Sequence, residues 1–139
     1  QIGSASLINK KSIDDSIKLD LNFSMMRFWD KDLYIYSKKN NYLLIPGMSS
    51  IKDFKEAISY NCCIIKIFPV AKKDILLDIN KFKQISFVGA GDIALNDINK
   101  FKSLGFRGVV IGSKGYDGEK FDPEIFKILN SRMKNTSIN

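Results

Sequence analysis

The sequence contains no histidine, and this absence excludes several kinds of catalytic site. Imidazole acid–base catalysis is excluded, and so is a serine or cysteine nucleophile activated by a histidine. A zinc site would have to use two adjacent cysteines and carboxylates, and these show no recognisable ligand spacing. We therefore expect no metal ion and no other cofactor.

Arginine and cysteine are scarce, and long apolar runs are lacking. Only Arg27, Arg107 and Arg132 occur, whereas nucleic-acid-binding proteins usually concentrate arginines among aromatic residues, so the net charge of +7 does not indicate nucleic acid. That charge would instead help to attract a small anionic substrate.

Cys62 and Cys63 are adjacent and cannot form an ordinary disulfide together, which favours a reducing, cytoplasmic location. No run approaches the roughly 20 apolar residues of a membrane span, and no signal peptide is recognisable, so we expect no membrane partner.

Strand-like and helix-like segments alternate along the chain. The strand patterns lie at 1–6, 21–26, 42–45, 62–68, 85–88 and 108–111, and the helix patterns at 11–18, 31–38, 51–60, 73–82, 94–104 and 123–133. This alternation predicts an α/β fold with a parallel sheet, either a (β/α) barrel or a doubly wound sheet. We expect one domain over 1–133 and a disordered polar tail over 134–139.

Capping signals mark several helix ends. Ser12 and Ser50 are each followed three residues later by an aspartate, which is typical of an N-cap. Asp92 precedes the helix pattern at 94–104 and favours an N-cap there. Gly105 has the position of a helix C-terminus.

A lysine interrupts an apolar strand pattern, CCIIKIFPV, from Cys62 to Val70. Because strand side chains alternate, Ile64, Lys66 and Phe68 share one face. Partial desolvation between these neighbours would lower the pKa of the ammonium and create an amine that attacks carbonyl carbon. The alternative is a lysine whose head extends into water at the end of the strand.

The order of short motifs around this lysine resembles the KDPG/KHG aldolase family, the 2-keto-3-deoxy-phosphogluconate and 2-keto-4-hydroxyglutarate aldolases. That family has an "IGAGT" strand, an "IPG" strand end, a Schiff-base "KxFP" strand, a "TGGI" turn and a "GGS" turn. This chain has, in the same order, QIGSAS, IPGMSS, KIFP, SFVGAGDI and VVIGSKG. The resemblance extends from Ile2 to about Gly115, and the lysine strand following an "IPG" strand is its most specific part.

The resemblance implies a TIM-type barrel, present here as about six β-α units that lack the first two. It also implies a class I aldolase that cleaves a 2-keto-4-hydroxy acid, with or without a phosphate group, to pyruvate and an aldehyde. It implies a homo-oligomer, a trimer by analogy with the family. The family's general acid/base glutamate and a substrate-binding arginine belong to the second strand, which has no counterpart in this sequence.

By the same resemblance, Lys66 is the Schiff-base nucleophile, and six residues shape the pocket around the keto acid: Ser6, Arg27, Pro46, Gly47, Phe68 and Pro69. The expected phosphate site comprises Gly91, Gly112, Ser113 and Lys114. The sequence departs from the family there, because Ala90 replaces a threonine and Asp92 replaces a glycine.

These departures keep other functions open. One is a catalytically degenerate aldolase-like barrel that binds a small anion or serves as an assembly subunit. Another is a phosphate-binding barrel synthase or isomerase, which fits the glycine turns but leaves Lys66 without a role. A carboxylate within reach of Lys66 would favour the enzyme.

Overall fold

The computed structural model describes residues 1–70 and 79–112, together with Pro123, Glu124 and Lys127. Strands and helices alternate in this part of the chain, as expected. In chain order the elements are β1 (Gly3–Leu7), α1 (Lys10–Lys18), β2 (Phe23–Met26), α2 (Lys31–Lys39), β3 (Leu44–Ile45), β4 (Gly47–Met48), α3 (Ile51–Ser59), β5 (Ile64–Ile67), the 3-10 turn η1 (Ile79–Lys81), β6 (Ser86–Ala90), the 3-10 turn η2 (Leu95–Asp97), α5 (Ile98–Ser103) and β7 (Gly108–Val110).

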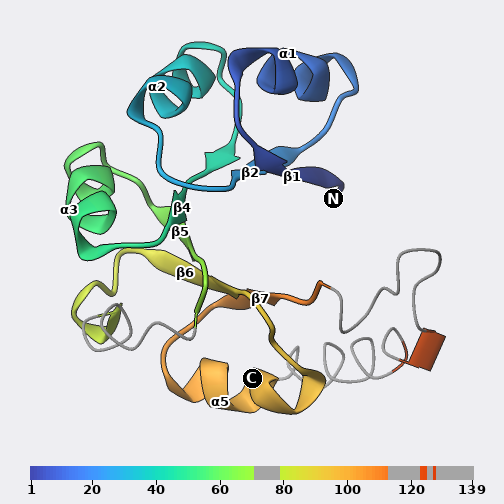
Figure 1. Cartoon of the computed structure of the whole chain (residues 1–139), viewed down its shortest axis with the longest axis vertical. Helices are drawn as coiled ribbons and strands as arrows, with labels where there is room; N and C mark the ends of the chain where they lie inside the picture. The colour runs from blue at the N-terminus through green and yellow to red at the C-terminus, as the bar shows by residue number, and fades with distance from the viewer. Residues whose placement is uncertain (71–78, 113–122, 125–126, 128–139) are drawn as a thin grey trace.

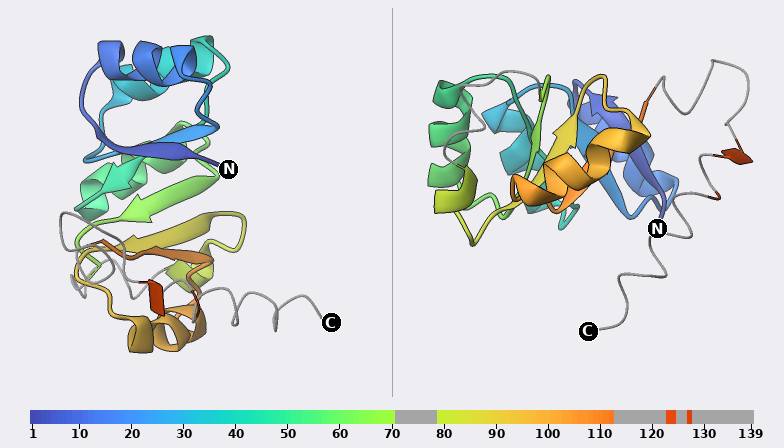
Figure 2. Two further views of the ribbon diagram at one scale, coloured as in Figure 1. Left: turned by 90° about the vertical axis from the view of Figure 1, so that its right-hand side faces the viewer. Right: turned by 90° about the horizontal axis from the view of Figure 1, so that it is seen from below.

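The strands are all parallel and lie side by side in chain order. One ladder joins β1, β2 and β3, and a second joins β4, β5, β6 and β7. Figure 1 shows α1, α2, α3 and α5 around the outer side of the curved sheet, and the left view of Figure 2 shows the strands crossing it in one direction. This is a partial parallel α/β barrel, so the predicted fold class is confirmed.

The two ladders meet at Pro46, which separates β3 from β4 within one extended segment. Leu44 pairs with β2, whereas Gly47 pairs with Lys66 of β5. Proline has no N–H to donate, so one hydrogen bond that would continue the ladder toward the start of β5 is missing. The carbonyl of Pro46 accepts a hydrogen bond from the Lys66 N–H at 2.8 Å. β3 ends at Ile45, as expected for the strand pattern at 42–45, but Gly47 begins the further strand β4, so the expectation that Gly47 belongs to a strand end is wrong.

The hydrophobic core lies between the sheet and the helices. Ile65 and Ile67 of β5 are fully buried and belong to the same core cluster as Phe54 and Ala57 of α3. Side chains alternate along a strand, so Ile64 and Lys66 occupy the opposite, concave face of the sheet.

A chain of hydroxyl groups joins α1 to the first two strands. Ser16 Oγ donates to the Ser12 carbonyl at 2.8 Å, Ser4 Oγ lies 3.1 Å from Ser16 Oγ and 2.7 Å from Ser24 Oγ, and Ser24 Oγ lies 2.7 Å from the Tyr42 hydroxyl. Each hydroxyl has one proton, so the direction follows: Tyr42 donates to Ser24, Ser24 to Ser4, and Ser4 to Ser16. The buried serines on this side of the sheet are therefore satisfied.

Two of the four expected helix-end signals are correct. Ser50 caps α3 by accepting the Asp53 N–H at 3.1 Å, and Gly105 follows α5 with a φ of +97°, which favours glycine.

The other two signals are wrong. Asn9 caps α1 by accepting the Ser12 N–H at 2.9 Å, so Ser12 lies inside the helix. The N-cap position before η2 is Ala94, whose N–H donates to the Asp97 carboxylate at 3.1 Å, and Asp92 is not the cap. Both errors arise because another short polar side chain nearby could reach the same helix end.

The expected helix at 73–82 lies outside the described residues except for η1, and so does the helix at 123–133 apart from three positions. The tail at 134–139 lies entirely outside them. In the part of the chain that the structure describes, no helix is long and apolar enough to cross a bilayer.

Candidate active site

Lys66 lies on the concave face of the sheet, near the C-terminal end of β5. It is 7% exposed, and it is the one charged residue among the described residues that is buried. Charged side chains are rarely buried without a partner, so a lysine in this position points to a special role.

Burial lowers the pKa of Lys66 below its ordinary value of 10.5. Loss of solvation is the whole cause, since no charged group contributes to the shift among the described residues. A lower pKa increases the fraction of neutral amine near neutral pH, and the neutral amine is the form that attacks a carbonyl group.

The amine of Lys66 is held by a backbone group at the end of a different strand. Lys66 Nζ donates a hydrogen bond to the carbonyl oxygen of Met26, the last residue of β2, at 2.5 Å. This bond gives a buried donor its partner without neutralising its charge. In the described residues no carboxylate bonds to this amine.

Gly47 leaves the space that this contact needs. Gly47 lies opposite Lys66 in the ladder, so a side chain there would point to the same side of the sheet. A Cβ at Gly47 would lie 2.6 Å from the Met26 oxygen and 2.4 Å from the Arg27 oxygen. Only glycine fits here, because the end of β2 packs directly on its Cα.

The other residues expected around the keto acid follow the C-terminal ends of the strands. Ser6 lies near the end of β1, exposed, with a φ of +63° beside a break in the β1–β2 register. Arg27 follows β2 and is exposed, with its guanidinium 5.3 Å from the centre of the Phe28 ring. Parallel strands bring these ends to one edge of the sheet, where barrel enzymes have their active sites.

Phe68 and Pro69 form a wall between β5 and the turn after β6. Both are half-buried, and Val70 beyond them donates its N–H to the carbonyl of Ala90 at 2.8 Å. Gly91 has a φ of +104°, and a Cβ there would lie 3.2 Å from the Phe68 ring and from the Pro69 Cα. The turn after β6 therefore packs directly on the segment that follows Lys66.

The four residues expected to bind phosphate are only partly described. Ala90 pairs with Val110, so Gly91 and Gly112 follow neighbouring strand ends. Gly112 is exposed, and nothing lies within 4 Å of its Cβ position. Ser113 and Lys114 lie outside the described residues.

Sequence reasoning missed the Met26 carbonyl and the Asp97 carboxylate that bonds the Ala94 N–H. The "IPG" resemblance pointed to Gly47, but nothing in the sequence indicated which backbone it would touch.

Within the described residues, no group of three cysteine, aspartate or glutamate side chains could hold a metal ion.

Solved structures with this arrangement include KDPG aldolases. The chain superposes on the KDPG aldolase of Legionella pneumophila, with pyruvate captured as a covalent carbinolamine, with a TM-score of 0.77 at 21% identity over 94% of this chain and 65% of that one. It superposes on the KDPG aldolase of Zymomonas mobilis ZM4, solved with 3-phosphoglycerate, with a TM-score of 0.75 at 19% identity over 99% and 66%. A native KDPGal structure gives a TM-score of 0.76 at 14% identity over 96% and 70%. The chain has the KDPG-aldolase fold.

The chain spans about two-thirds of the length of these aldolases. No protein-family model matches its sequence, and no curated protein matches it significantly. At such identities the likeness is one of fold, and the KDPG-aldolase chemistry has to be argued from the residues of this chain.

Proposed function

We propose that this chain supplies the Schiff-base lysine of a class I aldolase that acts on a 2-keto-4-hydroxy acid. The observation that carries the proposal is the burial of Lys66 on the concave face of a KDPG-aldolase fold, with a pKa lowered by loss of solvation. Phe68, Pro69 and Gly91 build an apolar wall beside the strand end where a keto acid would enter.

The neutral Lys66 amine attacks C2 of the keto acid to form a carbinolamine, which loses water to give an iminium ion. A base then removes the proton of the C4 hydroxyl, the C3–C4 bond breaks, and its electron pair moves to the iminium nitrogen. The aldehyde leaves, C3 of the enamine takes up a proton, and water hydrolyses the imine to release pyruvate and restore the amine. The chain is unchanged at the end, and no electron acceptor is needed.

In this proposal the Met26 carbonyl holds the amine at rest, and the amine leaves it to attack C2. Ser6 and Arg27 serve the substrate carboxylate, and Pro46 and Gly47 form the floor of the site. Gly91, Gly112, Ser113 and Lys114 bind the distal group of the substrate. None of the carboxylates among the described residues bonds to Lys66, and we assign none of them as the base for the C4 hydroxyl. We further propose a cytoplasmic homotrimer that binds neither nucleic acid nor a membrane.

The proposal is tested by borohydride reduction in the presence of pyruvate. Reduction converts the imine into a stable secondary amine, so the intact protein should gain the mass of one reduced pyruvyl group. Lys66→Ala should lose this gain. A Lys66→Ala protein that gains the mass as readily as the wild type would overturn the proposal.

A second candidate function is a non-catalytic barrel that binds a small anion or serves as an assembly subunit. It is favoured by the lack of a carboxylate bonded to Lys66 in the described residues and by Asp92 in place of a glycine. Such a protein would bind pyruvate without forming a reducible imine, so the same reduction separates the two functions.

A further inference from the structure

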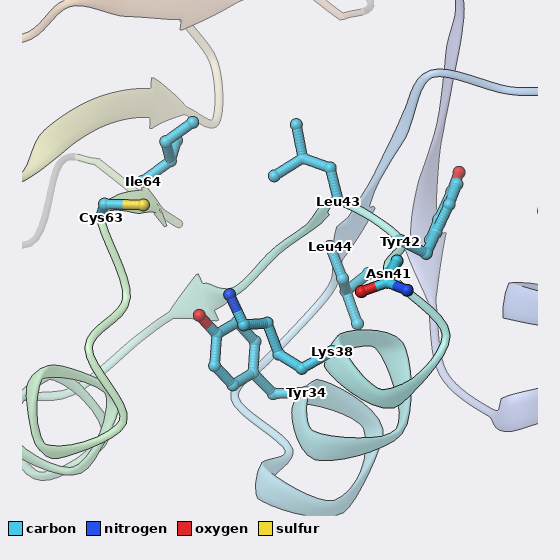
Figure 3. Close-up of a pocket in the computed structure, with 8 residues that line it drawn as sticks. All are labelled: Tyr34, Lys38, Asn41, Tyr42, Leu43, Leu44, Cys63 and Ile64. Carbon is cyan, nitrogen blue, oxygen red and sulfur yellow. The ribbon is translucent and has the colours of Figure 1, made fainter.

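A pocket of about 310 Å³ lies at the end of β5 opposite the candidate active site (Figure 3). Its walls come from α2, from the segment leading into β3 and from the start of β5. Lys38 and Tyr34 of α2 face Cys63 and Ile64 across the opening, and Leu43 lies beside them. The volume is near the lower end of the range for small-molecule sites.

The break in the sheet at Pro46 explains why this space is open. The ladder between β4 and β5 begins at Gly47 and Lys66, and Pro46 has no N–H with which to extend it toward Ile64. Leu44 and Ile64 therefore line a gap between two strands that are neighbours at their other ends. The proline thus forms the pocket as well as interrupting the strand.

The polar groups of the pocket favour a singly charged anion. Lys38 is its one cation, and among the described residues that line it none is an aspartate or glutamate. Burial raises the pKa of the neighbouring Cys62 thiol, and the positive charge of Lys38 opposes part of this rise, so the ammonium lies near the cysteine pair. The C-terminus of α2 ends here, and its partial negative charge disfavours anions, a compact dianion such as phosphate more than a monoanion.

Asn41, Tyr42 and Cys63 also line the pocket, and three of its lining residues are aliphatic. Leu43, Leu44 and Ile64 form one side of the pocket, and Leu43 is 48% exposed, which is unfavourable in water. Burial raises the pKa of Tyr34, so its hydroxyl stays neutral. A small molecule with a carboxylate and a short hydrocarbon chain would fit this lining. Its carboxylate would pair with the Lys38 ammonium, and its hydrocarbon chain would cover the aliphatic side chains.

We propose that this pocket binds a small aliphatic monocarboxylic acid, at a site separate from Lys66. The carboxylate pairs with the Lys38 ammonium, and the chain covers Leu43 and Ile64. The occupant would contact β5 two residues before Lys66, on the same face of the strand. The proposal does not depend on the aldolase reaction.

Alkylation of Cys63 by N-ethylmaleimide provides the test, with hexanoate as the probe and hexanol as its neutral counterpart. Cys63 is exposed and lines the pocket, whereas Cys62 is buried, so the peptide carrying both reports the accessible thiol. At about ten times its Kd, hexanoate should slow the alkylation about tenfold, because only the unoccupied protein reacts. Hexanol should have much less effect.

Two variants on neighbouring positions separate specific from general effects. Lys38→Met should lose the protection by hexanoate, whereas Lys39→Met, which removes an equal charge just outside the pocket, should keep it. Each variant is compared with itself in the absence of hexanoate, since Lys38 also acts on the Cys62 thiol. Equal protection of both variants, or no protection of the wild type, would overturn the proposal.

Discussion

Lys66 lies directly opposite Gly47 in the parallel ladder, and the missing side chain of Gly47 gives the Lys66 amine its path to the end of β2. The same carbonyl, that of Met26, both receives this amine and packs on the Gly47 Cα. The position of the candidate nucleophile therefore depends on a residue that contributes no side-chain atom.

Gly47→Ala should destabilise the fold and displace Lys66. The new methyl group would overlap the Met26 and Arg27 oxygens, and overpacking of this kind typically costs about 1–3 kcal/mol. Gly108→Ala is the matched control, because the added Cβ would meet only Val88, at an ordinary 3.9 Å. Urea unfolding measures both changes, and equal stabilities of the two variants would contradict the close packing at Gly47.

If Gly47→Ala folds, a second readout separates positioning from stability. Its pyruvate adduct after borohydride reduction should decrease relative to the wild type at a temperature where both are fully folded. The pH at which the adduct forms half-maximally should also change, because the amine has lost its place beside Met26. An unchanged yield and an unchanged pH profile would show that Gly47 does not position the amine.

The lowered pKa of Lys66 predicts how stability changes with pH. Between the folded and unfolded pKa values the unfolded chain binds more protons, so stability rises with pH across this window. The penalty for burying the ammonium is complete below the folded pKa and disappears above 10.5. Lys66→Met should therefore gain most over the wild type near neutral pH, and this gain should shrink toward pH 10.5.

Urea unfolding at a series of pH values measures this difference. Lys55→Met, which changes an exposed lysine on α3, should differ from the wild type by an amount that hardly varies with pH. A Lys66→Met difference that is equally constant would show that the Lys66 amine is not held in a desolvated site.

The N-terminus of α1 provides a test of the cap. Asn9→Ala should lower the free energy of unfolding by about 0.5–2 kcal/mol, because it removes the acceptor of the Ser12 N–H. Ser12→Ala should cost less, since it keeps that N–H and removes only an exposed side-chain hydrogen bond. The reverse order in urea unfolding would contradict the assignment of Asn9 as the N-cap.

The sequence predicted those features that depend on periodicity. Alternation along CCIIKIFPV was enough to separate Lys66 from Ile65 and Ile67, and the regular spacing of strands and helices was enough to predict a parallel sheet. The cap at Ser50 followed from a local pattern whose acceptor and donor are three residues apart.

Features that depend on contacts between distant segments could not be predicted in this way. The partner of Lys66 is a backbone carbonyl 40 residues away, and every residue type carries such a carbonyl. The sheet divides at Pro46 because this residue has no N–H for the ladder. The sequence does not show which of the two neighbouring strands lies on the side of that missing group. The cap before η2 required a choice between Asp92 and Asp97, which are equally suitable in composition.

The most direct test of the central claim is to locate the pyruvate adduct by peptide mapping after borohydride reduction. Modification should occur at Lys66, be lost in Lys66→Ala and be retained in Lys55→Ala, because the buried lysine has the lowered pKa. Modification spread evenly over exposed lysines such as Lys55, with none at Lys66, would contradict it.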